Sequence, residues 1–315
     1  MTCALKRVPL ALALSLAAIA THAADLAAAL TNVTFPENMA KANGKVYVST
    51  DGAIYALSGS GSNWQSSKAA VTFQNNERAD GCTFGGMTAM GQYVYSICTN
   101  KAGVHLFVLN SGDRAPAFSE VTLPKGAYIS GVALANGLTN DGNGNLYLAD
   151  HGAPLLPGKI VKLTLSGNNA LAGQSTIHNF FGCKANGVKF SNGKLYVTLN
   201  PFSYVGLSQL YRYDVGSNSL SNGKPLYSSW DFLDDFVLVN DGFLIADYMG
   251  GRVVHVKEDG SEDAAKLTDP TLPSSVTLSD DGKVLVTHRQ TTLLATGATG
   301  SVHVYDSIWG PLSLR

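Results

Sequence analysis

The sequence is poor in charged residues and has no excess of positive charge. Only 14% of its 315 residues are charged, with 22 basic and 23 acidic side chains. Nucleic-acid-binding surfaces need clustered basic residues, so the composition argues against a nucleic-acid partner. The 33 glycines, together with many Ser and Asn residues, are typical of a β-rich fold with short turns.

A long apolar run is also lacking. The run from Val8 to Ala20 has 13 residues, whereas a membrane-spanning helix needs about 20. Lys6 and Arg7 precede it and Thr21-His22-Ala23 follows it, which is typical of a secretory signal peptide over residues 1–23. We therefore expect a secreted or periplasmic protein without membrane insertion after cleavage. The mature chain would carry 20 basic and 23 acidic residues, a net charge of −3.

Cysteine is scarce as well. Cleavage of the signal peptide would leave Cys82, Cys98 and Cys183. Export favours disulfides, and Cys82 and Cys98 flank an apparent β-hairpin, so they could pair across it or remain reduced. Cys183 is then left over, and we expect a buried, inert thiol there.

A short pattern recurs along the chain: a turn that contains glycine, then an alternating strand with Tyr or β-branched residues. Gly144-Asn-Leu-Tyr-Leu-Ala and Gly193-Lys-Leu-Tyr-Val-Thr are two of its copies. The six repeated glycines are Gly44, Gly91, Gly144, Gly193, Gly242 and Gly282. Their separations of 40–53 residues fit one four-stranded sheet per repeat.

Six such sheets predict an all-β, six-bladed β-propeller of four-stranded antiparallel blades, formed by residues 24–315 as a single domain. Five or seven blades, or a β-sandwich, remain alternatives. The last recognisable strand, at 301–305, would share a blade with a strand from residues 25–35 and so close the ring. Asn43-Gly44 and Asn192-Gly193 are expected to be hairpin turns, because Asn and Gly accept positive φ.

In a propeller, the first strand of each blade lines the central channel, and its leading residue lies near one channel mouth. Counting back seven or eight residues from the repeated glycines finds these leading residues. They are Glu37, Asn136, Asn186, Asp234 or Asp235, and Ser275. Asn136 and Asn186 each precede a glycine and could form turns. A second turn signal follows each of them seven or eight residues later, however, so we expect each Asn to begin a strand.

Two carboxylates and two amide oxygens that converge on the axis are ligands that suit calcium. Without a cation the carboxylates would repel each other, and the lack of a His cluster argues against zinc. We therefore predict a Ca²⁺ site from Glu37, Asn136, Asn186 and Asp234 or Asp235, with Mn²⁺ or Zn²⁺ as alternatives. Taken singly, each of these residues could equally belong to a solvated loop or turn.

The same residues carry a family likeness. The chain resembles the regucalcin–gluconolactonase propellers, which are related to the paraoxonases and to diisopropylfluorophosphatase. The similar segments are Phe35-Pro-Glu-Asn, Ala135-Asn-Gly-Leu, Ala185-Asn-Gly-Val and Asp247-Tyr-Met-Gly-Gly-Arg-Val. Their order and spacing are more specific than any one of them.

The resemblance implies that Glu37, Asn186 and Asp234 or Asp235 bind the metal. Asn136 would be a fourth ligand or would bind substrate beside the metal. The hairpin length favours Asp235, whereas the family pattern of an acidic and then a small residue favours Asp234. The second, buried calcium site of the paraoxonases is not expected, because Asn38 and Gly137 stand where acids would be needed.

Further residues are candidates for catalysis or for the pocket wall. His288 falls where a channel histidine occurs in the phosphotriesterase-like relatives, and His151 follows a strand in the same way; either could equally be a packed or solvated histidine. Several aromatic residues near blade edges could shape a pocket or pack between blades. They are Tyr128, Phe181, Phe202, Tyr204, Trp230, Phe232 and Tyr248.

These observations predict an exported calcium-dependent lactonase or esterase that acts on a small-molecule substrate. The metal would polarise the carbonyl and stabilise the developing oxyanion. Asp234 or Asp235 would take the proton of the attacking water or would attack directly, and His288 could assist. One alternative is a non-catalytic propeller that binds a small molecule, a glycan or a protein. A strictosidine-synthase-like enzyme is another, against which the metal ligands argue. The sequence indicates no oligomeric state.

Overall fold

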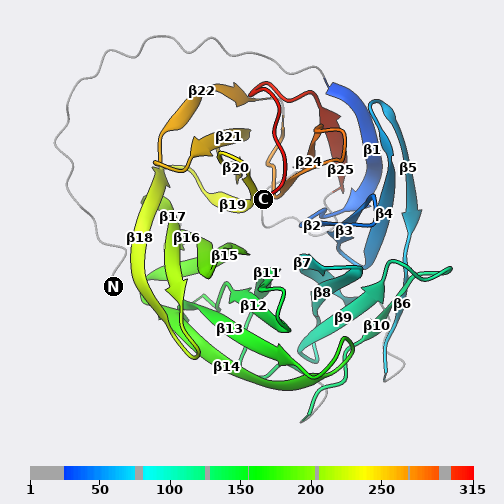
Figure 1. Ribbon diagram of the computed structural model, residues 1–315, viewed down its shortest axis with the longest axis vertical. Helices are drawn as coiled ribbons and strands as arrows, with labels where there is room; N and C mark the ends of the chain where they lie inside the picture. The colour runs from blue at the N-terminus through cyan, green and yellow to red at the C-terminus, as the bar shows by residue number, and fades with distance from the viewer. Residues whose placement is uncertain are drawn as a thin grey trace.

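The computed structural model describes residues 25–74, 81–124, 128–154, 156–202, 206–268, 270–290 and 299–315. The predicted signal peptide, residues 1–23, lies outside these ranges. The elements within them are all β-strands, and the described residues include no helix long and apolar enough to cross a membrane. Figure 1 shows the strands gathered into six sheets around a central axis.

Each sheet forms one blade, and the predicted six-bladed propeller is confirmed. Blade 1 contains β2 (Met39–Ala42), β3 (Lys45–Thr50), β4 (Ala53–Ser60) and β5 (Asn63–Lys68). Blade 2 contains β6 (Ala70–Thr72), β7 (Thr83–Met90), β8 (Tyr93–Thr99), β9 (Val104–Asn110) and β10 (Ala117–Glu120). Blade 3 contains β11 (Ala135–Asn140), β12 (Asn145–Asp150), β13 (Gly158–Leu165) and β14 (Leu171–Phe180).

The second half of the ring repeats this plan. Blade 4 contains β15 (Cys183–Ser191), β16 (Lys194–Pro201), β17 (Ser208–Val215) and β18 (Leu220–Ser229). Blade 5 contains β19 (Leu233–Val239), β20 (Gly242–Asp247), β21 (Arg252–Lys257) and β22 (Glu262–Leu267). Blade 6 contains β23 (Val276–Leu278), β24 (Val284–Arg289), β25 (Thr299–Tyr305) and β1 (Asp25–Thr34).

Blade 6 closes the ring in the predicted way. Its outer strand β1 comes from the start of the described chain and pairs antiparallel with β25, from Asp25 opposite Tyr305 to Thr34 opposite Thr299. Blade 2 departs from the expected four strands, because the short strand β6 joins the outer strand β10 in parallel. This extra strand is the connection from blade 1, which runs along the outer edge of blade 2 before the chain turns inward.

The apolar core is divided among the interfaces between blades. Each of six clusters of buried side chains joins two neighbouring blades, including one that joins blade 6 to blade 1. Because every blade covers the apolar face of its neighbour, no blade is expected to hold its structure alone. The inner strands are therefore fixed from both sides, and the residues at their ends are held in place.

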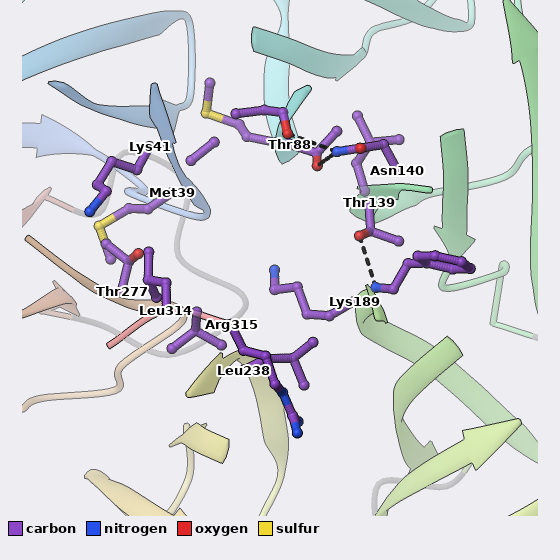
Figure 2. A pocket seen from close by; sticks show the side chains of 16 residues that line it. Met39, Lys41, Thr88, Thr139, Asn140, Lys189, Leu238, Thr277, Leu314 and Arg315 are labelled. Atoms are coloured by element: carbon purple, nitrogen blue, oxygen red, sulfur yellow. Dashed lines mark hydrogen bonds between the residues drawn. The ribbon is translucent and has the colours of Figure 1, made fainter. Parts of the chain in front are cut away.

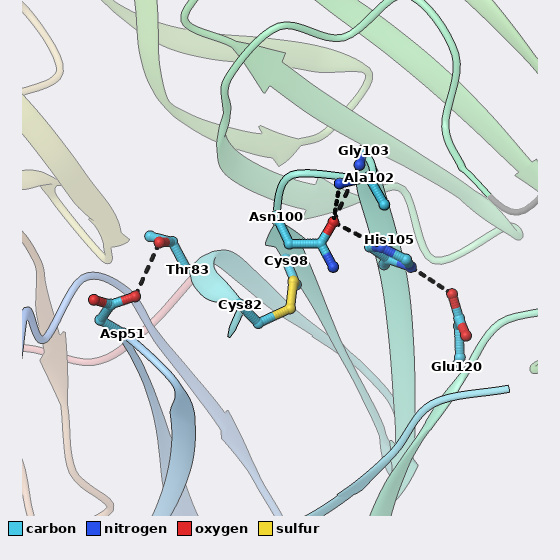
Figure 3. Close-up of a disulfide and its surroundings, with 9 residues drawn as sticks. All are labelled: Asp51, Cys82, Thr83, Cys98, Asn100, Ala102, Gly103, His105 and Glu120. Atoms are coloured by element: carbon cyan, nitrogen blue, oxygen red, sulfur yellow. Dashed lines mark hydrogen bonds and ion pairs between the residues drawn. A yellow bond between two sulfur atoms is a disulfide. The ribbon is translucent and has the colours of Figure 1, made fainter. Parts of the chain in front are cut away.

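Of the two possibilities left open for Cys82 and Cys98, the structure has the disulfide, with the two Cα atoms 5.5 Å apart. It lies at the open end of the β7–β8 hairpin, as Figure 3 shows. Beside it, the buried His105 pairs with Glu120 across β9 and β10 at 2.6 Å. The prediction for Cys183 is half correct: the residue is buried, but it is disulfide-bonded rather than a free thiol.

Candidate functional site

The two predicted Asn residues lie within inner strands, near the ends at the mouth, and do not form hairpin turns. The hairpin residues Asn43 and Asn192 have positive φ angles of 47° and 50°. Asn136 and Asn186 do not share this conformation, and they lie within β11 and β15. The sequence interpretation of these two Asn-Gly pairs is therefore confirmed.

A β-bulge recurs at the mouth end of the inner strands. In β11, β15 and β19 the pairing with the second strand skips two residues on the inner strand. The skipped pairs are Asn136-Gly137, Asn186-Gly187 and Asp234-Asp235, and β7 has the corresponding pair Gly85-Gly86. Bulges re-aim side chains and are frequent next to active sites.

This register shows which of the two aspartates is equivalent to Asn136 and Asn186. Asp234 is the first residue of its bulge, as Asn136 and Asn186 are of theirs, whereas Asp235 is equivalent to Gly137 and Gly187. Counting from the repeated glycine misled here, because Gly242 is the first residue of β20 while Gly193 lies in the hairpin turn.

The residues that directly follow the mouth residues, such as Gly137 and Gly187, form a second ring. The glycines in this second ring let the inner strands approach closely. A side-chain carbon at Gly137 would lie 2.5 Å from the carbonyl oxygen of Asn186, and one at Gly187 would lie 2.9 Å from that of Asp234. Thr198 adds a tie between blades 4 and 5, because its hydroxyl donates to the Asp234 carbonyl at 2.7 Å. Each of these mouth residues is thus positioned by the blade before it.

The mouth residues form two contacting pairs. The Asn136 amide donates to Glu37 at 3.5 Å, and the Asn186 amide hydrogen-bonds to Asp234. Asn186 and Asp234 are buried, while Glu37 and Asn136 are half-buried and reach solvent. The Asn186 Oδ1 atom is buried without a hydrogen-bond partner, which leaves an oxygen available to a ligand.

The electrostatics of Asp234 follow from its burial. The pKa of its carboxyl is raised well above the ordinary value, chiefly because burial disfavours the charged form, and further because Asp235 lies beside it. The hydrogen bond from Asn186 opposes this shift only in part. A nearby cation would reverse the balance and favour the carboxylate.

Arg289 connects the two pairs. Its guanidinium forms an ion pair with Glu37, and its Nε donates to the Pro36 carbonyl at 3.3 Å. It also packs over the rings of Phe35 and Tyr248, with centroids 5.2 and 5.6 Å away. Tyr248 in turn lies close enough to Asp234 to be affected by its charge. Burial and, secondarily, this charge raise the pKa of Tyr248 to about 12. Arg289 and Tyr248 therefore connect the surroundings of Glu37 with those of Asp234.

Asp235 instead anchors a cluster below the mouth. Its carboxylate accepts hydrogen bonds from Asn38 at 2.8 Å and from Ser275 at 3.1 Å. Lys189 completes the cluster, with its Nζ 2.8 and 3.0 Å from the two carboxylate oxygens. The prediction that Ser275 belongs to the mouth is wrong by one residue, because Ser275 lies in this second ring while Ser274 aligns with the mouth.

Two predicted histidines have other surroundings. His288 faces away from Arg289 along β24, accepts from the Thr271 amide at 3.3 Å through Nδ1, and lies 2.7 Å from the Tyr305 hydroxyl through Nε2. Burial lowers its pKa to about 4. The structure thus does not bring His288 to the mouth. His151 is buried near Phe232, and its pKa is likewise lowered to about 4, chiefly by burial.

A cavity of about 370 Å³ occupies the channel on the side of the Asp235 cluster that faces away from the mouth. Figure 2 shows Lys189 reaching into it, with Thr88, Asn140 and the C-terminal residue Arg315 also at its wall. The polar groups of Thr88 and Asn140 bond to each other at 2.7 Å. Lys189 both lines this cavity and pairs with Asp235, so it stands between the cavity and the mouth.

Exposed apolar side chains gather at the mouth end of blades 3 to 5. The large exposed ones among the described residues are Leu134, Leu156, Phe181, Trp230 and Met249. Leu134, Phe181 and Trp230 lie just before the inner strands, and Leu156 and Met249 follow the second strands, which return to the same end. Of the aromatic residues predicted at the pocket wall, Phe232 and Tyr248 are buried behind this rim. Tyr204 lies outside the described residues.

The mouth residues suit a hard cation. The ligand atoms that they offer are all oxygens, from Glu37, Asn136, Asn186 and Asp234. The Asn186 Oδ1 atom has no hydrogen-bond partner, and no basic group contributes to the pKa shift of Asp234. Within the described ranges no three His, Cys, Asp or Glu side chains converge. A metal would therefore depend on the amides as much as on the carboxylates, which fits calcium better than zinc.

Comparison with known proteins supports the architecture. No protein-family model and no curated protein sequence matches the chain. Among solved structures, a gluconolactonase from Xanthomonas campestris has a TM-score of 0.61 and 13% identity, over 88% of both chains. A luciferin-regenerating enzyme has a TM-score of 0.60 and 14% identity, over 89% of this chain and 93% of that one. Regucalcin from Agrobacterium tumefaciens, a calcium-binding protein, has a TM-score of 0.56 and 13% identity, over 89% and 95%.

The chain has the fold of these propellers. The resemblance to the regucalcin–gluconolactonase group, which the sequence motifs indicated, therefore holds for the architecture. Identities of 13–14% establish the fold and not the activity.

Sequence reasoning missed Arg289 and Lys189. Both lie outside the repeat phase that pointed to the mouth, because Arg289 ends a second strand and Lys189 lies three residues beyond Asn186. The only available signal for Arg289 was that it directly follows His288, since neighbouring strand residues point to opposite faces.

Proposed function

We propose that this protein is a metal-dependent hydrolase of lactones or esters, with calcium as its ion. The observation that carries the proposal is the buried Asn186 Oδ1 without a partner, next to a buried Asp234 carboxyl, in a mouth that also holds Glu37 and Asn136. The same fold occurs in a gluconolactonase and in a calcium-binding regucalcin, which supports both parts of the proposal.

Glu37, Asn136, Asn186 and Asp234 would hold the ion. When bound, it would supply the positive charge that polarises a carbonyl and favours attack by water. Asp234 would be ionised in that state and would accept the proton of the attacking water at its carboxylate. The Thr198 hydroxyl holds the backbone carbonyl of Asp234 through a hydrogen bond of 2.7 Å. The Asp234 carboxylate would therefore keep its direction during the proton transfer.

Tyr248 is suited to stabilise the negative charge that develops on the substrate oxygen. Its hydroxyl is buried, lacks a hydrogen-bond partner and lies within the electrostatic reach of Asp234. With its pKa raised to about 12, the hydroxyl stays protonated at neutral pH. It could therefore donate a hydrogen bond to an oxyanion, a contact that strengthens as charge develops.

The apolar rim favours a substrate with an alkyl or acyl group next to the reacting carbonyl. Phe181 and Trp230 have 63% and 76% of their surface exposed, and such clustered exposure is typical of binding surfaces. A purely polar sugar lactone would gain little from these side chains, whereas an aliphatic chain would gain about 0.8 kcal/mol for each buried methylene.

The predicted signal peptide supports placement of this reaction outside the cytoplasm, in the periplasm or the medium. The disulfide between Cys82 and Cys98 is consistent with an oxidising compartment. Detection of the processed chain, starting near residue 24, in a periplasmic or culture fraction would test this part of the proposal.

The test is a metal analysis of the purified protein, joined to a panel of lactones and esters with and without chelator. We expect one bound calcium per chain and turnover that chelation abolishes and added Ca²⁺ restores. Glu37→Gln should lose both metal and turnover, whereas the matched change Glu258→Gln, at an exposed carboxylate paired with Arg315, should change neither. Turnover that survives chelation would contradict the metal-dependent mechanism.

A second candidate function is a binding protein without catalysis. It is favoured by one observation: Arg289 already neutralises Glu37 without any metal. In that case the purified protein would contain no calcium and would hydrolyse nothing in the panel.

A further inference from the structure

Arg289 is a built component of the mouth rather than a surface side chain. Only 5% of its surface is exposed. Its guanidinium packs over the rings of Phe35 and Tyr248, and its Nε donates to the Pro36 carbonyl at 3.3 Å. These contacts aim the remaining donors of the guanidinium at Glu37.

Two of the three carboxylates near the mouth, Glu37 and Asp235, already have a basic partner. A buried guanidinium needs a carboxylate nearby, because removing one partner of a buried ion pair leaves an uncompensated charge. Asp235 is already taken by Lys189, and Asp234 is held by Asn186. Glu37 is thus the counter-ion of Arg289.

Glu37 is also the most accessible carboxylate of the proposed metal site. A divalent cation that binds there must share or displace the guanidinium, because a carboxylate with two oxygens cannot serve both at full strength. The positive charge of Arg289 would in addition repel the incoming ion within a site that solvent screens poorly.

We propose that Arg289 competes with the metal for Glu37 and so sets the calcium affinity of the site. This inference rests on the proposed metal site. The competition makes the site weaker than its ligand set would give, and it provides a stable metal-free form in which Glu37 remains paired.

The experiment is a calorimetric titration of the metal-free protein with Ca²⁺, for the wild type, Arg289→Gln and Arg289→Lys. We expect Arg289→Gln to bind Ca²⁺ at least tenfold more tightly than the wild type. Arg289→Lys should lie between them, because lysine keeps the charge but lacks the planar fork that the two rings and Pro36 hold. It also serves as the second variant if the glutamine variant does not fold, which circular dichroism would show.

The outcomes separate this inference from the proposed function. Equal or weaker Ca²⁺ binding by both variants, with a wild type that binds, would overturn the competition and leave the metal site standing. Binding by Arg289→Gln but not by the wild type would support the competition and refute metal dependence of the native protein. Absence of binding in all three proteins would refute both.

Discussion

The Asp235 cluster offers the sharpest test of the site assignment. Lys189→Met would leave the Asp235 carboxylate, which is 2% exposed, without its positive partner. Breaking a buried ion pair in this way costs about 3–5 kcal/mol. Because Lys189 is partly exposed, and because Asn38 and Ser275 still donate to Asp235, we expect a loss near the lower end, about 3 kcal/mol.

The assay is urea denaturation of the wild type, Lys189→Met and the double variant Lys189→Met/Asp235→Asn. Without a buried charge, the double variant should recover to within about 1 kcal/mol of the wild type, since losing both partners is far less costly than losing one. Lys194→Met is the matched control, because its pair with Asp214 is about 40% exposed, and exposed pairs contribute about 0–1 kcal/mol.

A loss below about 1 kcal/mol in Lys189→Met, or no recovery in the double variant, would refute an anchoring role for Asp235. The exclusion of Asp235 from the metal ligands would then lose its energetic support. The expected loss and recovery would leave Asp234 as the aspartate available to a ligand.

Four further predictions follow from the structure. The pKa of His288 is lowered to about 4, so the folded state should lose up to about 3 kcal/mol relative to neutral pH as the pH falls from about 6.5 to 4; urea denaturation at several pH values should show a flatter profile for His288→Asn. Replacing Cys82 and Cys98 together by Ser should cost about 3 kcal/mol, because the bond closes a 16-residue loop; a reductant should shift the wild-type denaturation midpoint at least as far. Tyr248→Phe should lower kcat about 100-fold without changing Ca²⁺ affinity, because it removes one oxyanion donor; equal effects on both would indicate a structural role. In a series of lactones, kcat/KM should rise less steeply with alkyl chain length in Trp230→Ser than in the wild type; an unchanged rise would show that the alkyl chain does not contact Trp230.

Much of the fold was predictable because hairpin turns leave a strong local signal. The glycine-containing turns and alternating strands recur at blade length, and the blade count and the ring closure follow from them. The parallel strand β6 was not predictable. It pairs through a long connection along the outer edge of blade 2, and no local residue pattern marks such a pairing.

The strand positions at the channel mouth were predictable to within one residue. Asn136 and Asn186 share a repeat phase that the structure confirms. Asp234 and Asp235 could not be told apart, because a bulge on the inner strand and a shift of Gly242 out of the turn each move the count by one. Arg289 was out of reach for another reason: its ion pair joins blade 6 to blade 1, and sequence spacing says nothing about contacts across blades.

Ring closure through β1 and β25 also governs how the chain can mature. The first and last strands of the described chain are mutual partners, so every nascent or truncated form that lacks residues 299–305 is an open arc with two exposed blade edges. Such edges are prone to pair with other chains, and long-range strand pairing is intrinsically slow. The protein thus has unpaired blade edges, and a risk of aggregation, until its last blade is complete.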